Sequence, residues 1–229
     1  LKLLPSEPNT GIIFKRTDLR QNNVILPIYD NVIDTTLCTT SSNEHGVKVS
    51  TIEHLMGALY GLGIDNLVVE VNSQELPILD GSAKVFIDLI LDTGIQSSTI
   101  PIKLIKINKK ISYNEGTKSI SLDRSRVASE IDFQIKYVNQ VIGTQRNKIN
   151  IFNDDLNDIF SSRTFCLYQD VEKLKEAGFA KGGSLDNAIV VDEKKVLNKD
   201  GLRNSKEFVN HKILDCMGDL YLSGYRIVG

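Results

Sequence analysis

The chain has 229 residues, of which 41% are hydrophobic and 24% are charged, a composition typical of a globular protein long enough for one large or two small cores. A formal net charge of −2 offers no basic face for a phosphate backbone, so we do not expect nucleic acid as a partner. The three cysteines are odd in number and form no CxxC pair, which argues against a disulfide framework and against a thiolate metal site. No apolar run approaches the roughly 20 residues that cross a bilayer. We therefore expect a cytoplasmic protein without stable membrane insertion.

The first half of the chain alternates short strands with two helices. Strands are predicted by β-type runs between turn signals, and helices by apolar residues at helical spacing. In chain order we expect strands at residues 11–14 and 24–28, a helix at 50–61, a strand at 67–71 and a helix at 82–91. The polar stretch 96–99 predicts a boundary between a domain at residues 1–97 and a domain at 98–229.

The second half repeats the order of strands before helices. We expect strands at residues 102–107, 119–122 and 130–137, a βαβ unit at about 163–191 and a last helix at about 205–222. Mixed helices and strands in both halves predict an α+β fold built from two α/β domains.

The helix expected at residues 50–61 carries a glutamate and a histidine near its start. Four residues form its apolar face, Ile52, Leu55, Met56 and Leu59, and His54 points away from that face. His54 is therefore either a solvated or hydrogen-bonded structural residue or a metal ligand. Glu53 follows Ser50 at the spacing of a capping box, which would tie it to the helix start. The alternative is that Glu53 accepts a proton during catalysis.

The helix expected at residues 205–222 carries His211, Asp215 and Asp219 four residues apart. This spacing forms one polar stripe opposite an apolar face. The stripe is either a solvated surface or part of a metal site, because His-x-x-x-Asp on one helical face brings an imidazole and a carboxylate within reach of one cation. With His54 as a third ligand, the set would suit a catalytic zinc ion that lowers the pKa of water to about 7.

Two other polar segments have simpler interpretations. His45 lies in a turn, where a surface position is expected. The loop at residues 181–184 lacks the spacing of a phosphate-binding loop, and a turn between strands explains it better.

Several longer strings occur in a characteristic order. They are DTTLCTT (34–40), STIEHL (50–55), GLGIDN (61–66), PILDGS (77–82), SRTF (162–165), GGSLDNA (182–188), LNKDGLR (197–203) and HKILD (211–215). Together they resemble the UDP-3-O-acyl-N-acetylglucosamine deacetylase family, zinc enzymes of lipid A synthesis, over nearly the whole chain.

The resemblance implies a role for each polar residue of the two helices. It implies that zinc is held by His54, His211 and Asp215, and that Glu53 is the general base. It also implies that Thr164 and Lys212 help to stabilise the oxyanion formed from the acetamide carbonyl. Asp219 would orient and charge a histidine that protonates the departing amine.

The resemblance also implies a fold and a substrate. The fold is a two-domain α/β sandwich in which each domain packs a mostly antiparallel sheet on helices and the helices of the two domains face each other. The expected partner is an acylated UDP-sugar, bound by a monomer. A βαβ insert at about 165–191 would form an apolar passage for the acyl chain. Candidate lining residues are Phe165, Leu167, Ala180 and Ala188, for which ordinary packing is the alternative.

The chain departs from the family pattern at both ends. The family begins about 25 residues earlier, and its general-acid histidine lies about nine residues beyond the equivalent of Gly229. We therefore expect a chain truncated at both ends. The alternative to a working deacetylase is a fragment that binds zinc and sugar nucleotide without efficient turnover. A zinc peptidase is a third hypothesis, but the chain lacks the His-Glu-x-x-His helix usual in such enzymes.

Overall fold

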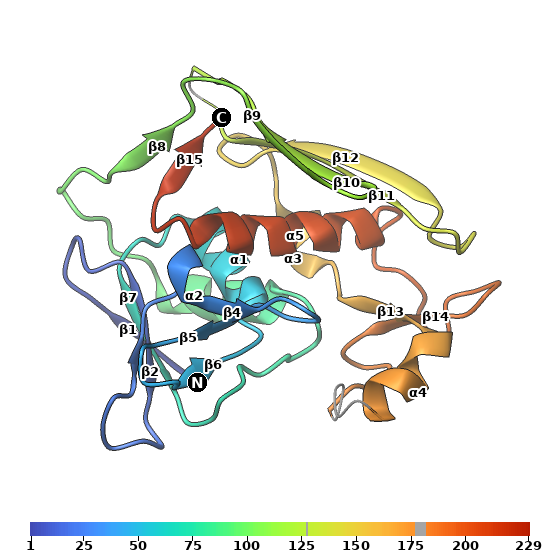
Figure 1. Ribbon diagram of the computed structural model, residues 1–229, viewed down its shortest axis with the longest axis horizontal. Coiled ribbons are helices and arrows are strands. Elements are labelled where there is room, and N and C mark those ends of the chain that lie inside the picture. Colours follow the sequence, from blue (N-terminus) through green and yellow to red (C-terminus); the bar gives the residue numbers. More distant parts are fainter. Residues whose placement is uncertain (127, 177–181) are drawn as a thin grey trace.

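A computed structural model describes residues 1–126, 128–176 and 182–229. It confirms the α+β fold, with most of the helices in the middle of the molecule and sheets on either side of them (Figure 1). The longest helix, α5 (Glu207–Tyr221), crosses the centre. The sheet of the first half lies on one side of α5, and the hairpins of the second half lie on the other.

The first half contains a four-stranded sheet of strand order β1-β7-β2-β3. Its strands are β1 (Lys2–Pro5), β2 (Ile12–Arg16), β3 (Val24–Ile25) and β7 (Leu67–Val71). Strands β2 and β7 pair in parallel, and the other pairs are antiparallel. Alternate residues of β2 and β7 are buried, as expected for a sheet with one face on the core. A second, antiparallel sheet contains β4 (Val32–Asp34), β5 (Thr40–Ser42) and β6 (Lys48–Val49), preceded by the short 3-10 helix η1 (Tyr29–Asn31).

Two helices complete the first half, α1 (Glu53–Leu62) and α2 (Lys84–Thr93). The first eight residues of α1 are all buried, so this helix has no solvated face. One side of α1 faces the core of its own half, and α5 covers another side. The side of α1 that carries His54 is therefore enclosed by the second half of the chain.

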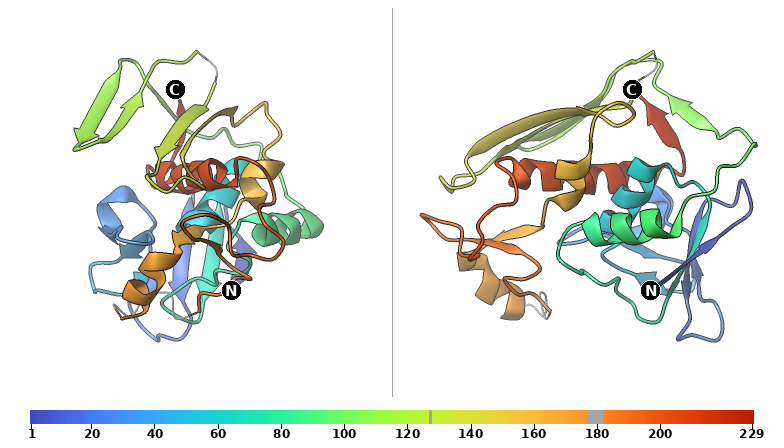
Figure 2. Two further views of the ribbon diagram at one scale, coloured as in Figure 1. Left: turned by 90° about the vertical axis from the view of Figure 1, so that its right-hand side faces the viewer. Right: turned by 180° about the vertical axis from the view of Figure 1, so that it is seen from behind.

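The second half is built from hairpins, short strand pairs and the remaining helices. Two antiparallel hairpins are formed by β9 (Ile111–Glu115) with β10 (Lys118–Leu122) and by β11 (Glu130–Lys136) with β12 (Thr144–Asn150). The exposed hairpin β9–β10 projects from the body in the side view of Figure 2. Strand β8 (Leu104–Lys106) pairs in parallel with β15 (Arg226–Val228).

The βαβ unit is confirmed at one end of α5. Strands β13 (Phe165–Leu167) and β14 (Ile189–Val191) pair in parallel, and α4 (Tyr168–Glu176) lies between them in the chain. The short helix α3 (Asn157–Ser161) precedes this unit.

Helices α1 and α5 face each other, as expected for this fold. Glycines allow the close approach. A Cβ atom at Gly57 would lie 2.7 Å from the carbonyl oxygen of Leu214, and a Cβ atom at Gly218 would collide with the carbonyl of Glu53. One hydrophobic core contains side chains from both halves, such as Leu59 and Met217. The domain boundary near residue 97 remains a prediction.

Most of the predicted elements were found with shifted ends, whereas the strand at residues 67–71 was predicted to the residue. The strand expected at 24–28 is shorter, at Val24–Ile25, and the helices expected from residues 50 and 82 begin at Glu53 and Lys84. Among the described residues, none of the helices is long and apolar enough to cross a membrane.

Candidate functional site

The site lies where the start of α1 meets α5. His54 comes from the first turn of α1, and His211 and Asp215 come from one face of α5. The Nε2 atoms of His54 and His211 lie 3.6 and 3.4 Å from Asp215 Oδ1, and one ligand atom from each of the three residues lies within 4.8 Å of the others. His54 and His211 are only 4% and 1% exposed. The three residues that we predicted as ligands therefore form one buried cluster.

Electrostatics keep the cluster in the form that binds a cation. Burial lowers the pKa of His54, and it lowers the pKa of His211 to about 4, so both imidazoles are neutral near pH 7. Burial raises the pKa of Asp215, but His211, Lys212 and His54 lower it by more, to about 2. Two neutral imidazoles and one carboxylate are the donors that a catalytic zinc site uses.

One carboxylate oxygen of the cluster has no hydrogen-bond partner in the part of the chain that the structure describes. His211 Nδ1 lies 3.0 Å from the carbonyl oxygen of Ser162, a contact in which Nδ1 carries the hydrogen and Nε2 keeps its lone pair toward Asp215. Asp215 Oδ1 is the one buried side-chain polar atom of the described chain without a hydrogen-bond partner. Ligand atoms about 2.1 Å from a tetrahedral ion lie about 3.4 Å apart, close to the two measured distances. The residues therefore fit a divalent cation.

Glu53 stands beside this cluster, and its capping-box interpretation was wrong. No side chain caps the start of α1. The hydroxyl of Ser50 accepts a hydrogen bond from Thr40, whereas Glu53 Oε2 accepts one from the backbone N–H of Thr39 at 3.0 Å. Burial, reinforced by the negative charge of Asp215, raises the pKa of Glu53 to about 8. The carboxyl group therefore has a pKa in the range that suits a general base.

Asp219 lies one turn beyond Asp215 on α5. Its Oδ1 accepts a hydrogen bond of 2.8 Å from the hydroxyl of Thr39. Desolvation by neighbouring groups raises the pKa of Asp219, although the Thr39 hydrogen bond opposes that rise. Along the stripe, His211 is buried, Asp215 is half-buried and Asp219 is exposed, so a solvated face describes only the Asp219 end.

Lys212 brings a positive charge to the same place. Its Nζ donates to Asp215 Oδ2 at 2.9 Å and lies 5.6 Å from the ring centroid of Phe165. Burial lowers the pKa of Lys212, but Asp215, Tyr137 and Glu53 together raise it by more, so the side chain remains a cation. Thr164 lies immediately before β13, and its backbone N–H donates to the carbonyl of Gly81 at 2.7 Å. This bond ties the segment that carries Thr164 to the first half.

The four candidate residues for the acyl-chain passage lie in different environments. Phe165 is half-buried and packs edge-on against Phe208, with ring centroids 5.0 Å apart, and against His211 at 6.4 Å. Leu167 packs against the smaller hydrophobic core of the second half. Ala188 precedes β14 and is half-buried, and Ala180 lies outside the described residues. Phe165 therefore lies next to the cluster, and the lining role of all four residues remains a prediction.

A buried ion pair between Arg163 and Glu207 adjoins the segment that contacts His211, and the sequence analysis did not predict it. Glu207 is fully buried, and its carboxylate accepts hydrogen bonds from the backbone N–H and the guanidinium of Arg163. The carbonyl group that contacts His211 belongs to Ser162, and Ser162 is the residue before Arg163. The partners are 44 positions apart, so no local pattern could have revealed the pair.

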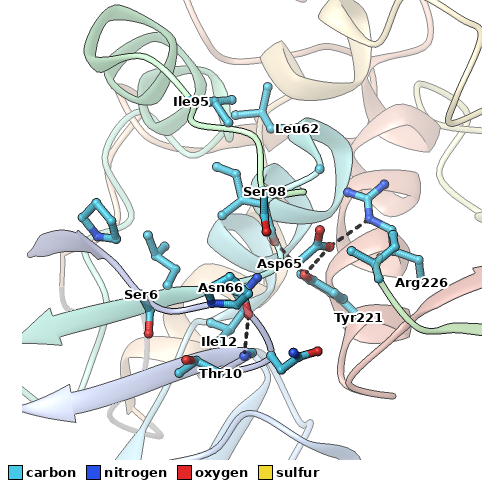
Figure 3. Close-up of a pocket in the computed structure, with 18 of the residues that line it drawn as sticks. Ser6, Thr10, Ile12, Leu62, Asp65, Asn66, Ile95, Ser98, Tyr221 and Arg226 are labelled. Carbon is cyan, nitrogen blue, oxygen red and sulfur yellow. Dashed lines mark hydrogen bonds and ion pairs between the residues drawn. The ribbon is translucent and has the colours of Figure 1, made fainter. Parts of the chain in front are cut away.

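A large hollow lies at the C-terminal ends of α1 and α5, away from the cluster (Figure 3). Its volume is about 2190 Å³, and its lining includes Leu62, Asp65, Tyr221 and Arg226. The Asp65 carboxylate accepts hydrogen bonds from the hydroxyl of Tyr221 at 3.4 Å and from Arg226 Nε at 3.1 Å. None of the cluster residues lines the hollow, so it is separate from the candidate site.

The fold and the site define a class of protein: an α+β chain with two facing helices that bury a His–His–Asp cluster of cation-binding composition. Comparison with known families identifies the class. The family model for UDP-3-O-acyl N-acetylglycosamine deacetylase matches residues 1–229, and the chain belongs to this family.

Relatives of this chain carry the corresponding name. Proteins named UDP-3-O-acyl-N-acetylglucosamine deacetylase from Histophilus somni (strain 129Pt) and Pasteurella multocida (strain Pm70) are each 45% identical to this chain over 233 residues. The protein of that name from Haemophilus ducreyi (strain 35000HP / ATCC 700724) is 43% identical over 232 residues. Each alignment covers 100% of this chain and 76% of the relative. The resemblance expected from the sequence strings is confirmed.

Proposed function

We propose that this chain is a zinc-dependent deacetylase that hydrolyses the acetamide of a UDP-3-O-acyl-N-acetylglucosamine and releases acetate, as an early step of lipid A synthesis in the cytoplasm. Family membership supports the reaction and the substrate. The observation that carries the zinc proposal is the unpartnered Asp215 Oδ1, which faces the Nε2 atoms of His54 and His211.

His54, His211 and Asp215 would hold the zinc ion. Bound there, zinc would supply a Lewis acid that polarises the amide carbonyl and makes water more acidic. The chain's own residues prepare this site, because burial keeps both imidazoles neutral and the Ser162 carbonyl fixes the ring of His211.

Glu53 would act as the general base. Its raised pKa makes its carboxylate a better proton acceptor than an exposed glutamate. The hydrogen bond from Thr39 N–H to Oε2 fixes one oxygen, which leaves Oε1 as the atom that takes the proton from the attacking water. Asp219, four residues beyond Asp215, would serve the later proton delivery to the departing amine.

Lys212 and Thr164 would stabilise the oxyanion. The Lys212 ammonium is a positive charge held by Asp215 and by the face of Phe165, and preorganised charge contributes most where negative charge develops in the transition state. Thr164 would add a hydroxyl donor from the segment anchored to Gly81. The half-buried ring of Phe165 gives the acyl chain an apolar neighbour beside this site.

Acetate release from a UDP-3-O-acyl-N-acetylglucosamine tests the proposal. The zinc-loaded chain should release acetate, a chelator should abolish the release, and added zinc should restore it. Glu53→Gln should bind zinc like the parent but lose at least about 10²-fold in kcat, the lower range for a general base. His45→Ala is the matched control, because His45 is exposed. A folded, zinc-loaded parent that releases no acetate would contradict the proposed activity.

A further inference from the structure

Thr39 lies in the string at residues 34–40, none of which is assigned a catalytic or metal-binding role above. It lies just before β5 and is 6% exposed. Three of its polar groups are engaged. The N–H donates to Glu53 Oε2 at 3.0 Å, the hydroxyl donates to Asp219 Oδ1 at 2.8 Å, and the carbonyl accepts from the N–H of Ile52 at 3.4 Å. One residue therefore joins two acidic side chains that come from different helices.

The two carboxyl groups that Thr39 joins differ in exposure. Glu53 is buried at 8% exposure, whereas Asp219 is exposed. The oxygens of a buried carboxyl group need hydrogen-bond donors from the protein, because water does not reach them. Thr39 supplies one donor to each group, from its backbone and from its side chain.

The carbonyl of Thr39 adds a third connection. It accepts the N–H of Ile52, the residue immediately before α1. The threonine is thus tied to the start of α1 as well as to the Glu53 side chain, while its hydroxyl reaches α5. The distance between Glu53 and α5 is therefore set partly through Thr39.

We propose that Thr39 is a positioning residue, whose hydroxyl bridge to Asp219 holds the Glu53 carboxyl in its working position beside the His54–His211–Asp215 cluster. This inference rests on the proposed function and deepens it. Thr39 touches none of the three ligands in the contacts described above, so its loss should leave zinc binding intact. Misplacement of a catalytic group by about 1 Å costs up to about 10²-fold in rate, so the effect should fall on kcat.

The test uses three variants of the full chain. Thr39→Val keeps the shape and the backbone N–H but removes the hydroxyl, and Thr39→Ser restores a hydroxyl. Thr40→Val is the matched control, because Thr40 is also buried and its hydroxyl bonds to Ser50 at 3.0 Å and contacts Cys38 Sγ at 3.8 Å, with no hydrogen bond to either carboxyl group among the described residues. For each variant we would measure zinc content, melting temperature, and kcat and KM for acetate release.

Thr39→Val should lower kcat about 10-fold or more, with KM and zinc content within about twofold of the parent, in the range expected for a misplaced group. Thr39→Ser should recover most of the loss, and Thr40→Val should retain the kcat of the parent. An unchanged kcat in Thr39→Val would overturn the proposal. Equal losses of kcat in Thr39→Val and Thr40→Val would also overturn it, because they would indicate a general structural effect.

A second readout is independent of turnover. In protein labelled with ¹³C at its carboxyl groups, the signals of Glu53 and Asp219 can be assigned with Glu53→Gln and Asp219→Asn. Thr39→Val should shift both signals, and Thr40→Val should shift neither. A parent that binds zinc but releases no acetate would refute the proposed function, while a Glu53 signal unmoved by Thr39→Val would refute the positioning role itself.

Discussion

Replacing Glu207 with glutamine removes the negative charge that holds a guanidinium inside the protein. The carboxylate of Glu207 accepts hydrogen bonds from the N–H, Nε and Nη2 of Arg163 and from the N–H of Arg203. The side chains of Glu207 and Arg163 are 0% and 8% exposed. Removing one partner of a buried ion pair costs about 3–5 kcal/mol, because it leaves an uncompensated charge. The glutamine also presents an NH₂ donor where the carboxylate accepted.

The assay for Glu207→Gln is urea denaturation, with the free energy of unfolding extrapolated to water. The expected loss is about 3 kcal/mol or more, with an unchanged dependence on urea concentration. Asp88→Asn is the control, because the Lys84–Asp88 pair is half exposed on both sides and such pairs contribute at most about 1 kcal/mol. A loss in Glu207→Gln no larger than that of the control would refute the reasoning.

Three further predictions concern the two helices. Because the pKa of Glu53 is about 8 in the folded chain and near 4.5 in the unfolded chain, the metal-free protein should lose stability as pH rises through this window. In urea titrations, Glu53→Gln should be more stable than the parent at about pH 8 but not at about pH 4.5. An equal difference in the free energy of unfolding between variant and parent at the two pH values would contradict this. Gly218→Ala should cost about 1–3 kcal/mol or more, since its Cβ would collide with the Glu53 carbonyl, whereas Gly182→Ala, which meets nothing within 4 Å, should leave the melting temperature unchanged. Lys212→Met should lower kcat for acetate release by about 10²–10³-fold with the zinc content preserved; an unchanged kcat would exclude Lys212 from oxyanion stabilisation.

Local pattern predicted those elements whose apolar residues recur clearly. The strand at Leu67–Val71 was predicted to the residue, and the βαβ unit and α5 within a few residues. The short strands β4, β5 and β6 were missed, because segments such as Thr40–Ser42 are buried through polar side chains and carry no hydrophobic alternation. Strand β12 was missed for a related reason, since its seven residues include one hydrophobic side chain.

The candidate site shows the same division between local and distant information. Helical spacing was enough to predict that His211 and Asp215 share a face. It could not determine what Glu53 contacts, and the local capping rule predicted the wrong partner, because the carboxylate reaches Thr39 across 14 positions instead. The Arg163–Glu207 pair, joined across 44 positions, could come only from the folded structure or from a family resemblance that assigned these residues a role.

The most direct test of the account is the metal content of the purified chain by elemental analysis, with His54→Ala and Asp215→Ala measured in parallel. One substitution removes a ligand from α1 and the other removes a ligand from α5. The account predicts about one zinc per chain in the parent, as expected of a mononuclear site, and a marked loss in both variants. A well-folded parent without stoichiometric zinc, or variants that keep it, would contradict the assignment of His54, His211 and Asp215 as a zinc site.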